Sequence, residues 1–299
     1  MPYALALRAN RSRRAIGRLF GDGRARPQSV LYAIDNFDAR RGFQQRGRGG
    51  DWARGLLFDA MFRFLLSGVD RIAFGTEGAR CAYEKAAGKS MRAIDTTVIE
   101  ELDQECGCGR ITKDENLLLF LGALDDRKGV LELMASWPEI HRRSPSVRLV
   151  IVGKGDYEER VGAWAERAPS VTFVVDPPRA DIHAWYRRAR TVVLLSQPHP
   201  RWREQVGLPI TEGLSHGCRI IATTETGLAD WLVRNGHCVV PPDCSAEVLA
   251  AEVALSFAGV SDASAVLSTL PTESTRITVD RWLTRSGRRS FNGSSQSTV

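Results

Sequence analysis

Two glutamates flank the start of a predicted helix in the second half of the sequence. Glu204 and Glu212 stand eight positions apart, with Gly207 at the mouth of the helix and Pro209 in its first turn. Proline is tolerated there because the first N–H groups of a helix have no partner within it. Those N–H groups attract phosphate, and a carboxylate can accept hydrogen bonds from two adjacent hydroxyls. The combination suits a nucleotide-sugar site. By itself, however, a pair of glutamates at this spacing is better explained as two surface residues beside an ordinary helix.

The residues around this pair resemble the donor-binding signature of the retaining glycosyltransferases of family 4, which have the GT-B fold. That signature places seven residues between two glutamates and a glycine three positions after the first. A small-residue helix end, a hydrophobic strand and a Gly-containing loop follow it, matched here by residues 213–227. The resemblance extends over residues 116–252 and implies two Rossmann-like domains that face a cleft.

The resemblance also implies roles for individual residues. Glu204 would orient the donor sugar and stabilise positive charge in the transition state, and Glu212 would hold the ribose hydroxyls. Gly207 and Leu208 would offer backbone N–H groups to the diphosphate. The donor phosphate would accept the acceptor's proton, so the reaction would proceed with retention and without a metal. Electrostatic preorganisation would supply most of the rate.

A second candidate loop is Gly122-Ala-Leu-Asp-Asp-Arg-Lys-Gly129, which follows a predicted buried strand and precedes a predicted helix. A cation there would lie near the C-terminal ends of the strands, where open α/β sheets bind ligands. The resemblance implies that Lys128 pairs with the donor diphosphate, in a donor site that includes Gly122. The family has an arginine where this chain has Ala123. Arg127 would supply that charge, or else it belongs to a solvated helix start.

Residues 116–257 alternate short apolar runs with helical patterns, which predicts a parallel sheet with crossover helices. Strands are expected at residues 117–122, 147–152, 171–175, 191–195, 219–222 and 237–240. Helices are expected at residues 129–143, 157–168, 180–189, after 207, and at 228–234 and 246–257. The turn that contains Gly153 and Gly155 lacks the third glycine of a dinucleotide fingerprint, so we interpret both as turn formers.

The first 110 residues carry a less regular pattern. Strands are expected at 29–34, 71–74 and 91–98, and helices at 52–66 and 77–87, about half of a Rossmann-like domain. We therefore expect an α/β, GT-B-like fold in which the N-terminal domain is incomplete. Its parts would be a partial acceptor-side domain (1–110), a donor-binding domain (111–270), a terminal helix (271–285) and a disordered tail (286–299). The histidine that the family often carries after the first of these strands is replaced by Asp35 or missing.

The composition is that of a globular protein, with 43% hydrophobic and 25% charged residues. No apolar run approaches the ~20 residues that span a bilayer, and the first residues do not form a secretory signal, so we expect a cytoplasmic location. The net charge is +6, and arginines cluster at residues 11–14 and 40–41. They would attract the anionic inner face of the cell membrane, or form a solvated basic face. Nucleic acid is not expected as a partner, because no recognisable module accompanies this charge.

The cysteines and histidines give no sign of a metal centre. Six cysteines are scattered along the chain, none with zinc-finger spacing, and Cys106 and Cys108 are the one close pair. We interpret the cysteines as free thiols, with a metal at 106–108 as the minor alternative. His216 is interpreted as structural at a helix end, and His183 has no identifiable partner. We expect no metal and no cofactor.

Together these observations predict a metal-independent retaining glycosyltransferase of the hexosyltransferase type. It would move a sugar from a UDP- or GDP-sugar to a glycan or a lipid-linked acceptor. The alternative is a protein of the same fold that binds a nucleotide-sugar but has reduced or lost catalysis. Ala123, the missing histidine and the short first domain favour that alternative.

Overall fold

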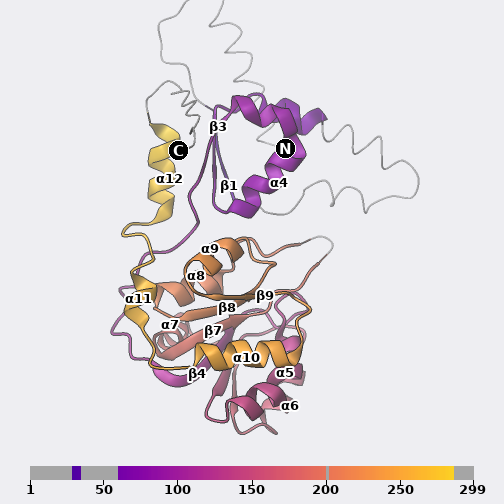
Figure 1. Cartoon of the computed structure of the whole chain (residues 1–299), viewed down its shortest axis with the longest axis vertical. Helices are drawn as coiled ribbons and strands as arrows, with labels where there is room; N and C mark the ends of the chain where they lie inside the picture. The colour runs from indigo at the N-terminus through magenta and orange to yellow at the C-terminus, as the bar shows by residue number, and fades with distance from the viewer. Residues whose placement is uncertain (1–28, 35–59, 200–201, 286–299) are drawn as a thin grey trace, which may run out of the picture.

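The structure, a computed structural model, describes residues 29–34, 60–199 and 202–285. These residues form two parallel sheets with flanking helices (Figure 1). Several expectations fall outside them: the two arginine clusters, Asp35, the first part of the helix expected at 52–66, and the tail at 286–299. Within the described ranges, no helix is both long enough and apolar enough to cross a membrane.

The larger sheet contains six parallel strands in the order β6-β5-β4-β7-β8-β9. They are β4 (Asp114–Leu121), β5 (Arg148–Val152), β6 (Val171–Val174), β7 (Ala189–Leu194), β8 (Arg219–Thr223) and β9 (Cys238–Val240). From β4 the chain moves outward through β5 and β6, then returns to β7 beside β4 and continues to the opposite edge. The strand order therefore reverses between β4 and β7. In open α/β sheets this switch point, at the C-terminal ends of the strands, is where ligands bind.

Helices cover both faces of this sheet, and the central strands are accordingly continuous apolar runs. α5 (Val130–Arg143) and α10 (Ala246–Ser256) pack together on one face, and α7 (Arg179–Arg188) and α8 (Leu208–Ser215) lie on the other (Figure 1). α6 (Glu158–Ala165) and α9 (Ala229–Arg234) complete the crossovers. All the strands and helices expected here are confirmed, with ends shifted by a few residues. The short helix α11 (Ala263–Leu267), capped by Asp262, was not expected.

The smaller sheet has three described strands in the order β1-β2-β3, all parallel. They are β1 (Val30–Ala33), β2 (Arg71–Phe74) and β3 (Asp95–Val98), with α4 (Glu77–Ala87) between the last two. Residues 60–66 are helical, in agreement with the end of the expected helix. The strand expected from residue 91 is wrong in its first part. Residues 88–93 form a 3₁₀ helix, η1 (Gly88–Ala93), which buries Met91 in the core of this sheet.

The last described helix, α12 (Thr275–Thr284), returns to the smaller sheet, beside which it lies in Figure 1. Val279 and Leu283 pack against Ala73 of β2. The guanidinium group of Arg71, also on β2, donates hydrogen bonds to three backbone carbonyls at the end of α12, at 2.6 to 3.3 Å. A cation is favoured at this end of a helix because the carbonyl dipoles point toward it.

The chain crosses between the two sheets twice, in residues 99–113 and 257–274. The two crossings are joined where the second enters α12. The Leu102 N–H donates to the Thr275 hydroxyl oxygen at 3.2 Å, and that hydroxyl donates to the Leu102 carbonyl at 2.9 Å. Arg276 pairs with Glu101 at 3.0 Å beside them. Segments almost 175 residues apart in sequence therefore lie in direct contact.

Candidate active site

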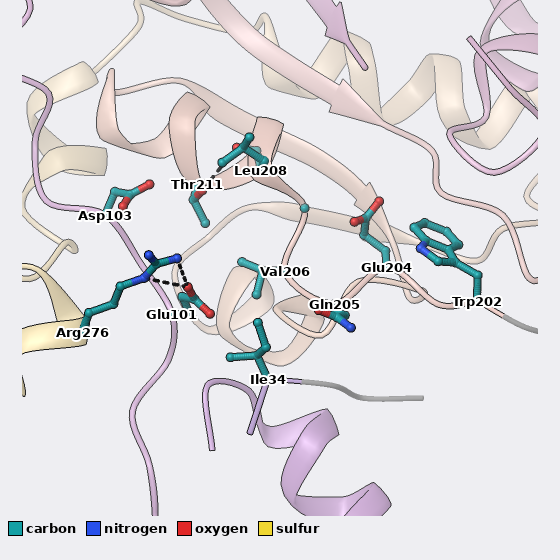
Figure 2. A pocket seen from close by; sticks show the side chains of 11 residues that line it. Ile34, Glu101, Asp103, Trp202, Glu204, Gln205, Val206, Leu208, Thr211 and Arg276 are labelled. Atoms are coloured by element: carbon teal, nitrogen blue, oxygen red, sulfur yellow. Dashed lines mark hydrogen bonds and ion pairs between the residues drawn. The ribbon is translucent and has the colours of Figure 1, made fainter. Parts of the chain in front are cut away.

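A cavity of about 410 Å³ lies at the start of α8, between the larger sheet and the smaller one (Figure 2). One wall is the segment from Trp202 to Leu208 together with Thr211. Ile34 comes from the end of β1, and Arg276 comes from α12. Because the segment from Trp202 follows β7, this cavity lies at the switch point of the larger sheet.

An ion pair joins the two loops that leave the switch point. Lys128 lies in the loop after β4 and Glu204 in the loop after β7, and the Lys128 Nζ is 2.5 Å from Glu204 Oε2. The Ser196 hydroxyl donates to the same oxygen at 3.1 Å. The side chains of Lys128 and Glu204 are only 15% and 8% exposed. Charges this far from water are stable when they are paired and hydrogen-bonded, so each residue holds the other in place.

Trp202 lies against the cations of this site, and Figure 2 shows it beside Glu204. The Nζ of Lys128 and the guanidinium carbon of Arg127 are each 4.9 Å from the centre of an indole ring of Trp202. Arg127 is also paired with Asp125, at 2.6 Å. Its charge is therefore directed to a neighbouring carboxylate and an aromatic face. Its expected role as a substitute for the arginine missing at Ala123 stays a prediction.

Glycines allow the loops at the switch point to approach each other closely. Gly129 has a φ of 73°, and a Cβ atom there would lie 1.9 Å from the carbonyl oxygen of Leu195. A Cβ on Gly153 would lie 2.0 Å from the carbonyl oxygen of Gly122. Neither position leaves room for a side chain. Gly153 is therefore required by a close approach of two loops, to which Gly122 also belongs, and its interpretation as a turn former stays a prediction.

The start of α8 faces the cavity. Gly207 is the N-cap, with a φ of 85°, and no side chain caps the helix start. Pro209 lies in the first turn, as expected, and Gly207 and Leu208 both line the cavity. The N-terminal amides of this helix give the cavity wall a partial positive charge. Together with Lys128 they make an environment suited to a phosphate group.

Glu212 lies on a different side of α8 from the cavity. Successive residues on a helix point about 100° apart, so Thr211 lines the cavity and Glu212 contacts Arg179 of α7. The Glu212 side chain is buried, and its Oε2 has no hydrogen-bond partner among the described residues. Burial and the neighbouring Glu212 carboxylate hold the pKa of Tyr186 well above its ordinary value, so its hydroxyl stays protonated. No pattern in the sequence indicated Arg179 as a partner of Glu212.

A cluster of potential metal ligands lies at the other end of α8. It comprises Cys106, Cys108, His183 and His216, whose ligand atoms are all within 4.8 Å of one another. Nothing in the spacing of these residues indicated that they meet, because each segment that carries them is distant in sequence from the next. The cysteines are free, as expected. His183, for which the sequence indicated no partner, contacts Cys106 and His216.

Residues 115–256, which form most of the larger sheet and its flanking helices, match the family model described as "Glycosyl transferases group 1". The match covers just under half of the chain, which in this part is similar to the group 1 glycosyl transferases. Over 188 residues the chain is 28% identical to a phosphatidyl-myo-inositol mannosyltransferase of Mycobacterium tuberculosis, an alignment that covers 61% of this chain and 48% of the mannosyltransferase. The chain thus spans about half, or less, of the length of the curated relatives that it matches.

Solved structures of glycosyltransferases share the fold. The crystal structure of WaaG, a glycosyltransferase involved in lipopolysaccharide biosynthesis, superposes with a TM-score of 0.57 at 18% identity, covering 86% of this chain and 75% of WaaG. TarM of S. aureus, in complex with Fondaparinux, alpha-GlcNAc-glycerol and UDP, gives 0.60 at 13% identity, covering 90% and 52%. The chain therefore has the α/β, GT-B-like fold that the sequence predicted.

Proposed function

We propose that this chain is a glycosyltransferase that moves a sugar from a nucleotide-diphosphate-sugar to a glycan or lipid-linked acceptor, with retention. The observation that carries the proposal is the Lys128–Glu204 pair beside the uncapped start of α8, at the switch point of a domain similar to the group 1 glycosyl transferases. Cationic and amide groups suited to a diphosphate lie next to a carboxylate suited to a sugar.

In this proposal the donor diphosphate occupies the cavity at the start of α8. Lys128 exchanges its contact with Glu204 for one with a phosphate oxygen, and the backbone N–H groups of Gly207 and Leu208 donate to the other oxygens. Glu204, released from the lysine, then faces the sugar. As positive charge develops on the sugar ring, its carboxylate stabilises that charge and keeps the ring in position.

The remainder of the donor extends along α8. Glu212, which lies on a different side of α8 from the cavity, holds the ribose hydroxyls once the exposed Arg179 side chain moves off its carboxylate. Its Oε2, without a hydrogen-bond partner among the described residues, offers an acceptor. A donor phosphate oxygen takes the proton from the acceptor hydroxyl. No step requires a divalent cation, because Lys128 and the helix amides balance the charge of the leaving diphosphate.

The acceptor approaches from the side of the smaller sheet. Ile34, Glu101 and Arg276 form that part of the cavity wall. The mannosyltransferase among the relatives is named for a phosphatidyl-myo-inositol substrate, and the TarM structure contains UDP. On the basis of these names we propose a lipid-linked or glycan acceptor and a UDP- or GDP-sugar donor. We further propose a cytoplasmic location with peripheral contact to an anionic membrane, on the basis of the arginine clusters in the first fifty residues.

Calorimetric titration of the whole chain with UDP, GDP and their common sugar conjugates tests the donor site, and an assay for release of the free nucleotide tests turnover. We expect micromolar binding of one nucleotide, weakened at least tenfold in Glu212→Gln and in Lys128→Met, as the loss of a charged hydrogen bond of about 1.5–3 kcal/mol requires. Glu139→Gln and Lys154→Met are matched controls, since both residues lie in surface pairs.

The outcomes separate binding from catalysis. Glu204→Gln should retain nucleotide binding and lose most turnover. Proton NMR of the first product formed should show the anomeric configuration of the donor. Nucleotide binding without release or transfer for any donor, in the presence of glycan and lipid-linked acceptors, would overturn the enzyme assignment and leave a nucleotide-sugar-binding protein. Absence of binding by any nucleotide would overturn the site.

A further inference from the structure

We propose that Cys106, Cys108, His183 and His216 bind one zinc ion in a closed structural site. The four residues come from three places in the fold. Cys106 and Cys108 lie in the first crossing between the sheets, His183 lies on α7, and His216 ends α8. Two thiolates and two imidazoles are a ligand set that zinc takes in structural sites.

The spacing of the ligand atoms fits a tetrahedral ion. His183 Nδ1 is 3.2 Å from His216 Nε2, Cys108 Sγ is 3.2 Å from the same His216 Nε2, and Cys106 Sγ is 3.7 Å from His183 Nδ1. With zinc about 2.3 Å from sulfur and about 2.0–2.1 Å from nitrogen, neighbouring ligand atoms lie about 3.3–3.8 Å apart. All four ligand atoms lie within 4.8 Å of one another.

Hydrogen bonds orient three of the four ligands, and one of them holds His216 in the tautomer that zinc requires. His216 Nδ1 is 2.6 Å from the backbone carbonyl of Glu212. A carbonyl can only accept, so Nδ1 carries the proton and Nε2 presents its lone pair to the cluster. The Arg187 guanidinium donates to Cys108 Sγ at 3.3 Å, and the Cys106 N–H donates to the Ser215 carbonyl at 2.8 Å. Partners of this kind orient ligands in metal sites and raise their affinity for the ion.

The chemistry of the set selects zinc among the divalent ions. Calcium and magnesium require oxygen ligands, and none of these four side chains supplies one. Sulfur and nitrogen ligands in equal number at tetrahedral spacing suit zinc. Four protein ligands complete its coordination, which leaves no position for substrate. The ion would therefore act on structure, and the transfer reaction would remain independent of it.

A zinc ion here would fasten the donor side of the active site. It would tie the crossing at residues 106–108 to the end of α8, which carries Glu212. It would also tie α7 to the same point, and α7 carries Arg179 one turn before His183. Because Arg179 pairs with Glu212, the ion would hold both partners of this pair in register from behind the cavity.

Metal analysis of the whole chain, produced with added zinc and purified under a phosphine reductant, tests the site. We expect one equivalent of zinc per chain in the native protein. Cys106→Ser/Cys108→Ser should contain close to none. The control Cys81→Ser/Cys244→Ser should retain one equivalent, since these two cysteines lie outside the cluster. Replacement by Co²⁺ should produce the intense visible absorption of a tetrahedral site and a thiolate-to-cobalt charge-transfer band.

Further measurements keep the proposal open to refutation if the double cysteine variant does not fold. His183→Ala changes a partly exposed residue, and should lose zinc while it retains the circular dichroism of the native chain. A strong chelator should lower the melting temperature of the native chain and leave that of His183→Ala unchanged. The site would be overturned if the reduced native protein contained no zinc. It would also be overturned if His183→Ala kept zinc at full stoichiometry, or if a Cys106–Cys108 disulfide survived the reductant.

Discussion

The ion pair between Lys128 and Glu204 can be tested by a double-mutant cycle. Methionine at position 128 keeps the apolar stem of the lysine and removes its charge. Glutamine at position 204 keeps the hydrogen bond from Ser196 and removes the carboxylate charge. At 2.5 Å and an effective dielectric constant of about 20, the gross attraction is about 7 kcal/mol. Desolvation of both groups offsets much of it.

The exposed fractions of the two side chains determine how much the pair contributes to the free energy of unfolding. Removing one partner of a fully buried pair costs about 3–5 kcal/mol, because the other charge is left without compensation. Lys128 is 15% exposed and Glu204 8% exposed, so water reaches the site and relieves part of that cost. We expect Lys128→Met to lower the free energy of unfolding by about 2–3 kcal/mol. Adding Glu204→Gln should restore most of it. The coupling energy is the sum of the two single losses minus the loss in the double variant, so it should be at least about 1.5 kcal/mol.

The assay is urea unfolding of the native chain, both single variants and the double variant, with equal m values as the condition for comparing them. The pair of Lys154 and Asp176 is a matched control, because it has the same type of contact at 2.6 Å but side chains 64% and 62% exposed. Its coupling should be below about 1 kcal/mol. A coupling at Lys128–Glu204 no larger than at the control pair would refute the view that burial makes this contact strong.

Three further outcomes are expected. Gly129→Ala should destabilise the chain by more than about 2 kcal/mol in urea unfolding, since its φ is positive and its Cβ would overlap the Leu195 carbonyl. A loss below about 0.5 kcal/mol, which is close to the precision of such measurements, would contradict the loop geometry. Burial raises the pKa of Glu100 to about 7, so the folded chain keeps a proton that the unfolded chain loses from about pH 4.5 upward. The stability that this proton provides is full below that pH and is lost as the pH rises through 7. Glu100→Gln should therefore stabilise the chain by up to about 3 kcal/mol at pH 8 and change little at pH 4, and an equal effect at both would contradict the assignment. Arg71→Met should speed amide hydrogen exchange in α12 at least tenfold, because three carbonyls at the end of that helix lose their donor; unchanged exchange would show that apolar packing alone holds the helix.

The strands and helices of the larger sheet could be predicted well because their signals in the sequence are local. Buried parallel strands appear as short apolar runs, and helix starts appear as Gly or Pro at fixed positions. The order of those elements then brings the loops after β4 and β7 to one edge of the sheet, and the family resemblance assigned Lys128 and Glu204 in these loops to one donor site. Their direct contact depends on side-chain rotamers and on the close approach of Gly129 to Leu195, which no local pattern encodes.

The sequence failed where the structure depends on distant contacts. Arg179 reaches Glu212 across two helices, and His183 meets His216 by the same packing. Cys106 and Cys108 join them from a segment without regular structure, where neither the 2-residue nor the 3.6-residue period indicates which way a side chain points. The extent of the 3₁₀ helix before β3 was missed because burial of Met91 outweighs the strand pattern there.

The return of α12 to the smaller sheet has a consequence for the order in which the chain folds. During synthesis the ribosome releases β1, β2 and β3 first, yet Val279 and Leu283 are part of the core that covers Ala73. Arg71 likewise meets its carbonyl partners more than 210 residues later. N-terminal domains usually fold first as they emerge. Here the smaller sheet precedes the six-stranded sheet along the chain, but its core is completed only after that larger sheet has been made. Until then the nascent smaller sheet has one apolar face without its final partner.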